Sequence, residues 1–182
     1  MKKAFFILSI LSFSSQVFCQ IIADHTVVDK FDDIPQYYLD QVKKMWVVYA
    51  GESHSEALRR GVELLEASYP TYAAEVAEYT SPLAYTSSYL RLDCNTWGDL
   101  DHASGWIRSY GEEDWYSSSS AIARTKAGIT YCNENTNLGL SVIAFGHCYT
   151  DGGENYISAT QQYVDYVAIH SYPTKVIYTT GP

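Results

Sequence analysis

The chain has 182 residues, and its hydrophobic fraction of 47% is enough for one domain with a sizeable core. The formal net charge is −9 at pH 7, from 12 basic and 21 acidic residues. This acidity disfavours nucleic acid and anionic membrane surfaces as partners, because both repel negative charge. A neutral substrate fits the charge balance better, and we expect no cofactor.

The N-terminus has the pattern of a secretory signal peptide over residues 1–19. Lys2 and Lys3 precede an apolar run over 4–11, and Ser-rich residues then lead to Val17 and Cys19. We expect cleavage after Cys19; lipid attachment at Cys19 is the alternative, which the bulky Phe18 disfavours. The apolar run is too short to span a bilayer, and no later segment is long and apolar enough to be a membrane helix. The pattern predicts a secreted, periplasmic or cell-surface protein without a membrane span.

Three cysteines follow the signal peptide, at Cys94, Cys132 and Cys148. An odd number allows at most one disulfide and leaves one thiol, and their spacing matches no zinc site. We therefore expect stability to come from a hydrophobic core.

The first half of the chain predicts a strand, a helix and a second strand. Residues 20–44 form a lead-in with a short helix over 37–42, and an apolar strand then runs to Ala50. The next helix, from Ser53 to Tyr69, has Arg59, Arg60, Glu63 and Glu66 mostly opposite an apolar stripe of Ala57, Leu58, Gly61, Val62 and Leu65. A strand is expected over 75–80 and a short helix between 82 and 92, followed by a long loop over 94–115.

The second half continues the alternation of helix and strand. The serines at 117–120 begin a helix that runs to Cys132, and a buried strand follows over 138–145. A helix over 157–168 and a strand over 175–180 complete the pattern. Alternation of this kind predicts an α/β fold with a mainly parallel sheet and helices on both faces. Because the chain stops directly after a strand, we expect a C-terminal part of the domain beyond Pro182.

Ser53 is the first candidate for a reacting residue, because it follows the first strand and opens a helix. Ligands collect at this edge of an α/β sheet, and the helix dipole favours a developing negative charge there. The alternative is purely structural: Ser53-His54-Ser55-Glu56 has the pattern of a capping box, in which Ser53 and Glu56 satisfy free N–H groups.

Several blocks of the sequence resemble the SGNH (GDSL-type) hydrolases, and in particular secreted bacterial members of unassigned function. The resemblance covers 46–182 and rests on Gly51-Glu52-Ser53-His54-Ser55, Thr96-Trp97-Gly98-Asp99, Gly111-Glu112-Glu113-Asp114-Trp115 and residues 175–182. It implies a three-layer α/β/α sandwich of flavodoxin-like topology, over residues 45–182, and ester hydrolysis by Ser53. It also implies oxyanion-hole roles for the Ser53 N–H and for Gly98.

This sequence departs from the family pattern in two features. Cys148, in Gly146-His147-Cys148-Tyr149, stands where the family has an asparagine of the oxyanion hole. The family's Asp-x-x-His block, which supplies the general base, has no counterpart, so the base is not identified. His54, His102, His147 and His170 remain as weak candidates for that role.

Flat aromatic residues in the 94–115 loop are candidates for substrate binding, because such side chains stack on sugar rings. They are Trp97, Trp106 and Trp115, and the alternative is that two of them anchor the loop to the core. The acids near Asp99 match no metal loop, so no metal is expected. The sequence thus predicts an exported esterase acting on an acylated carbohydrate or another neutral ester; the alternative is a non-catalytic carbohydrate- or surface-binding protein on the same fold.

Overall fold

The computed structural model describes residues 25–50, 53–77, 82–96, 107–108, 115–116, 118–145 and 153–178. The chain divides into two compact units, Met1–Ile34 and Pro35–Pro182. The described part of the first unit is a 3-10 helix, η1 (His25–Asp33). The second unit holds the sheet and the α-helices, and therefore all of the site described below. The predicted signal peptide lies outside the described residues.

The second unit combines helices with a parallel sheet and a short antiparallel one. Its first elements are α1 (Gln36–Val42), β1 (Trp46–Ala50), α2 (Ser53–Ser68), η2 (Pro70–Tyr72), β2 (Ala74–Ala77) and β3 (Leu90–Asp93). A two-stranded antiparallel sheet of β4 (Asn95–Thr96) and β5 (Ile107–Arg108) follows. The remaining elements are α3 (Ser119–Glu134), β6 (Leu140–Phe145), α4 (Gly153–Ile169) and β7 (Lys175–Tyr178). The predicted alternation of strand and helix is therefore present except between β2 and α3, where the described residues form β3, β4 and β5 in succession.

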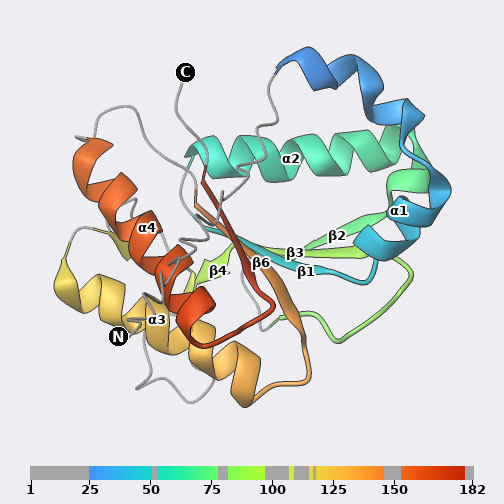
Figure 1. Cartoon of the computed structure of the whole chain (residues 1–182). Coiled ribbons are helices and arrows are strands. Elements are labelled where there is room, and N and C mark those ends of the chain that lie inside the picture. Colours follow the sequence, from blue (N-terminus) through green and yellow to red (C-terminus); the bar gives the residue numbers. More distant parts are fainter. Residues whose placement is uncertain are drawn as a thin grey trace, which may run out of the picture. The chain divides into compact units, whose positions relative to one another are not determined.

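The main sheet has five strands in the order β2-β3-β1-β6-β7, and every neighbouring pair is parallel. Figure 1 shows α2 on one face of this sheet and α3 and α4 on the other. The protein is thus an α/β fold with a parallel sheet between two helical layers, as the sequence predicts.

The prediction for residues 82–92 is wrong. The segment between 82 and 92 was expected to contain a short helix, but residues 82–89 have no helix and Leu90–Asp93 form strand β3. β3 lies between β2 and β1, so it belongs to the interior of the sheet. Its connection from β2 is long enough for a parallel crossover, although its described residues form no helix.

The core follows from the two-residue period of the strands, which sends alternate side chains to opposite faces of the sheet. Trp46 and Val48 of β1 pack with Cys132 of α3 on one face. Val47 and Tyr49 face the other way and pack in a cluster that includes Val62 of α2. β1 is therefore apolar on both faces, as expected of a central strand covered by helices on both sides.

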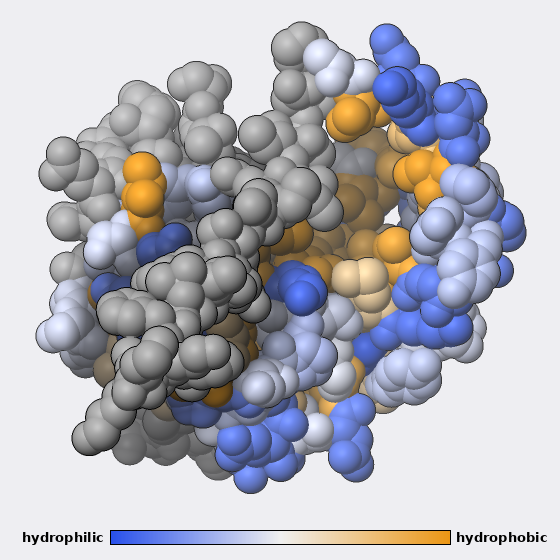
Figure 2. Space-filling model, in the orientation of Figure 1, coloured by the Kyte–Doolittle hydropathy of each residue, from blue (hydrophilic) through white to orange (hydrophobic). Residues whose placement is uncertain are grey.

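The surface on the side drawn in Figure 2 is mixed. Hydrophilic residues occupy much of the described outline, and hydrophobic residues gather toward the middle of the view. The exposed apolar side chains of the helical layers include Leu58, Leu64, Ile157 and Ile169. No helix among the described residues is long and apolar enough to cross a membrane.

The N-terminus of α3 is capped by a serine, as the serine run predicted. Ser118 is extended, with φ −146° and ψ 159°, and its hydroxyl accepts a hydrogen bond from the Ala121 N–H at 3.1 Å. This bond satisfies one of the N–H groups that the first turn of a helix leaves unpaired. The serine run therefore marks the beginning of a helix and is no linker.

Replacing Ser118 with alanine should lower the free energy of unfolding by about 1 kcal/mol, because the alanine cannot cap the helix. Urea unfolding followed by circular dichroism measures the change. Ser120→Ala is the matched control, since Ser120 is an exposed residue of the same first turn. Equal losses in the two variants would show that the cap does not stabilise α3.

Candidate active site

The turn between β1 and α2 lies at the carboxyl edge of the sheet. β1 ends at Ala50, and Ser53 is the first residue of α2. After β1, the chain forms β2 and β3 on one side of this strand and later forms β6 and β7 on its other side. Open α/β sheets bind ligands at the carboxyl ends of their strands where the connections diverge in this way. The backbone of Ser53 is therefore at a position suited to ligand binding, while its side chain lies outside the described atoms.

Arg59 is a buried charged residue of α2 that packs against the end of β1. Its side chain is 1% exposed, and its Nη1 donates a hydrogen bond to the Tyr49 carbonyl oxygen at 3.2 Å. The predicted helical stripe placed Arg59 on the polar side with Arg60, and for Arg59 this is wrong. This hydrogen bond to a backbone carbonyl near the end of the strand offsets part of the cost of burying the guanidinium. Arg59 thus joins α2 to β1 close to the Ser53 turn.

Trp115 lies in the core beside the carboxyl ends of β6 and β7. Its ring stacks on Phe145 with centroids 4.3 Å apart, and Tyr156 meets it edge-on at 5.5 Å. Tyr163 donates a hydrogen bond from its hydroxyl to the Trp115 carbonyl. With no exposed surface, Trp115 has the packing of a loop anchor, which is the alternative that the sequence left open.

A buried polar cluster lies on the face of β3 that points toward α3. The Trp46 Nε1 donates to Asp93 Oδ2, while Asp93 Oδ1 has no hydrogen-bond partner in the structure as described. Burial raises the pKa of Asp93 to about 7, against the opposing effects of the Trp46 hydrogen bond and the positive charge of Arg91. This carboxyl group therefore titrates near neutral pH, although it is closed off from solvent.

Arg91 precedes Asp93 on the same face and is also fully buried. Its guanidinium donates to the carbonyl oxygens of Lys44 at 3.3 Å and Leu83 at 3.5 Å, and lies 5.3 Å from the centroid of the Tyr85 ring. Burial lowers the pKa of Arg91, and the charge of Asp93 opposes this effect. Sequence reasoning missed this cluster. The signal was the alternation of charged and apolar residues over 90–93, which is the period of a strand.

Cys132 lies in α3 near the same cluster. Burial, and secondarily the charge of Asp93, raises the pKa of its thiol to about 12. The thiolate is the nucleophilic form of cysteine, so this thiol is unreactive near neutral pH. Cys132 is a packing residue of the core.

His170 lies at the opposite edge of the sheet from Ser53. It follows the last residue of α4, which leads into the beginning of β7, whereas Ser53 follows the end of β1. Its Nδ1 is 2.9 Å from the Tyr166 carbonyl oxygen, and its ring stacks on Tyr172. This position separates His170 from any chemistry at the Ser53 turn.

The other predicted site residues lie outside the described residues. They are Trp97, Gly98, Trp106, His102, His147 and Cys148, and the side chain of His54 is also outside. Their roles stay predictions. Among the described side chains, no group of three or more His, Cys, Asp or Glu is arranged to hold a metal ion.

Comparisons of this chain with protein-family models, curated proteins and solved structures gave no match.

Proposed function

We propose that this protein is an exported SGNH-like serine hydrolase, with Ser53 as the nucleophile, acting on an acylated carbohydrate or another neutral ester. The observation that carries the proposal is the position of Ser53 as the first residue of α2, directly after the central strand β1. A hydroxyl there would attack the ester carbonyl while the helix dipole stabilises the oxyanion. The alcohol leaves, and water then hydrolyses the acyl-serine.

The strand order supports a flavodoxin-like topology for this proposal. Without β2, the order β3-β1-β6-β7 corresponds to the order 2-1-3-4 of the flavodoxin-like sheet. β2 would then be an additional edge strand outside β3. In this arrangement the ligand site lies between the carboxyl ends of β1 and its neighbours, where the Ser53 turn begins.

The remaining roles in the proposal come from the sequence. Gly98 and the Ser53 N–H would donate to the oxyanion, Cys148 occupies the position of the third donor, and Trp97 and Trp106 would contact the substrate. We assign no general base. His170 is the histidine whose side chain the structure describes, and it lies at the opposite edge of the sheet from Ser53. Export rests on the signal-peptide pattern of residues 1–19.

Ser53→Ala should lower the rate of p-nitrophenyl acetate hydrolysis by the full-length mature protein by about a thousandfold or more, because it removes the nucleophile. Acetylated xylan serves as the second substrate, with acetate release as the measurement. Ser68→Ala is the matched control, since Ser68 is an exposed serine at the other end of α2. It should hydrolyse both substrates at the wild-type rate.

Circular dichroism of both variants distinguishes a lost nucleophile from a lost fold. Hydrolysis by folded Ser53→Ala at the wild-type rate would contradict the proposal. Hydrolysis at the background rate by wild type, Ser53→Ala and Ser68→Ala, together with retention of these proteins on acetylated xylan beads, would favour the non-catalytic carbohydrate-binding alternative.

A further inference from the structure

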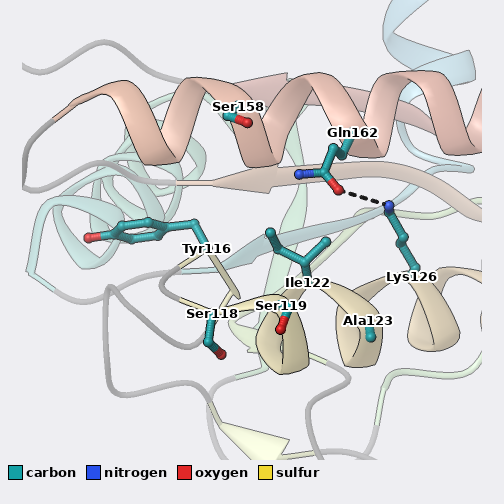
Figure 3. A pocket seen from close by; sticks show the side chains of 8 residues that line it. All are labelled: Tyr116, Ser118, Ser119, Ile122, Ala123, Lys126, Ser158 and Gln162. Carbon is teal, nitrogen blue, oxygen red and sulfur yellow. Dashed lines mark hydrogen bonds between the residues drawn. The ribbon is translucent and has the colours of Figure 1, made fainter.

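A groove lies between the N-terminal half of α3 and the middle of α4, with a volume of about 400 Å³. Figure 3 shows side chains from both helices around it. It is lined by Tyr116, Ser118, Ser119, Ile122, Ala123, Lys126, Ser158 and Gln162. Its volume is within the range of protein sites for small molecules.

The lining combines many neutral polar groups with a single charge. Three serine hydroxyls and the Gln162 amide offer donors and acceptors, and Ile122 with Ala123 adds an apolar patch. Among the described residues of this lining, Lys126 is the charged one and none is a carboxylate.

Lys126 is held in place by residues of α4. Its Nζ donates to Gln162 Oε1 at 3.1 Å and lies 5.7 Å from the centroid of the Tyr166 ring. In Figure 3, Lys126 and Gln162 reach toward each other from the two helices. An ammonium has three N–H donors, so the bond to Gln162 leaves donors for a bound anion. A cation oriented in this way loses less side-chain entropy when it binds a ligand than a mobile surface lysine does.

We propose that this groove binds a sugar acid, that is, a hexuronic acid residue with one carboxylate. The single cation matches a single negative charge, the serine hydroxyls and the Gln162 amide match sugar hydroxyls, and Ile122 with Ala123 packs against the C–H face of the ring. A phosphorylated ligand carries more charge than one lysine balances. The site is independent of the proposed ester hydrolysis, because none of its residues takes part in that chemistry.

The test is a titration of the full-length mature Ser53→Ala protein with sodium D-glucuronate, followed by amide chemical shifts in nuclear magnetic resonance spectra. We expect saturable shifts at groove residues with a dissociation constant of about 1 mM to 10 mM, as for a small ligand in an open site. D-Glucose, which lacks the carboxylate, and acetate, which lacks the sugar, should each bind at least about fivefold more weakly. Acetate binding as tight as glucuronate binding would overturn the proposal in favour of a simple anion site.

Lys126→Gln should weaken glucuronate binding about fivefold or more and leave glucose binding unchanged. Arg124→Gln is the matched control, because Arg124 is an exposed cation of the same helix outside the groove; it should bind glucuronate like the parent protein. Equal weakening in both variants, or no saturable shifts at groove residues up to about 50 mM glucuronate, would overturn the proposal. Because the parent already lacks Ser53, its inactivity has no bearing on either result.

Discussion

Replacing Trp115 with alanine should lower the free energy of unfolding by about 4 kcal/mol, the range found when a buried tryptophan or phenylalanine is truncated. Trp115 has no exposed surface and contacts Phe145, Tyr116 and Tyr156 through its ring. Its removal leaves a cavity among aromatic side chains, which cannot close it without losing their own contacts. Urea unfolding monitored by circular dichroism gives the free energy.

Two further variants test whether packing is the cause. Trp115→Phe keeps an aromatic ring on Phe145 and should lose about half as much as the alanine variant. Tyr37→Ala removes an aromatic ring that is 66% exposed and should change the free energy by less than about 1 kcal/mol. A loss of less than about 1 kcal/mol in Trp115→Ala would be incompatible with the observed packing.

The free energy of unfolding of Asp93→Asn, taken relative to that of wild type, should be higher at about pH 8 than at about pH 5. The folded pKa of Asp93 is about 7, above its ordinary value of 3.8. Between these values the unfolded chain loses the proton while the folded protein keeps it, so wild-type stability falls as the pH rises through this window. Each tenfold difference in proton affinity corresponds to about 1.4 kcal/mol, which gives roughly 4 kcal/mol over the window.

An asparagine at position 93 still accepts the Trp46 hydrogen bond but does not titrate. The variant therefore does not lose stability as the pH rises through this window. The difference in unfolding free energy between Asp93→Asn and wild type should therefore grow by about 2 to 4 kcal/mol from about pH 5 to about pH 8. Asp165→Asn, at an exposed carboxylate of α4, is the control and should show no such growth. A pH-independent difference for Asp93→Asn would mean that the carboxyl group titrates as it does in water.

Much of the fold follows from patterns that are local in the sequence. The apolar run over 138–145 predicts β6 because a strand covered on both faces needs apolar residues at successive positions. The serine run predicts α3 because a serine before a helix can bond to a free N–H, and Ser118 does so. Tyr69-Pro70 predicts the end of α2, which ends at Ser68.

The predictions that failed involve charged residues that tertiary contacts bury. β3 was missed because Arg91 and Asp93 suggest an exposed face, whereas both are buried and form hydrogen bonds with Trp46 and with the carbonyls of Lys44 and Leu83. Arg59 was placed on the polar side of α2 for the same reason, although its partner is a carbonyl of β1. Trp46, which bonds to Asp93, and Lys44, which bonds to Arg91, are each 47 residues away in sequence from their partners, so no local pattern reveals these contacts.

The central place of β1 also bears on how the chain folds as it is synthesised. Its neighbour on one side is β6, and Val47 pairs with Val142, so 95 residues must follow Val47 before that edge is closed. Until then the growing chain carries an open, apolar strand edge, which is the kind of surface that promotes aggregation and recruits chaperones. Contacts this distant in sequence also slow folding. We therefore expect β1 to be enclosed by strands on both sides only once β6 is available for pairing.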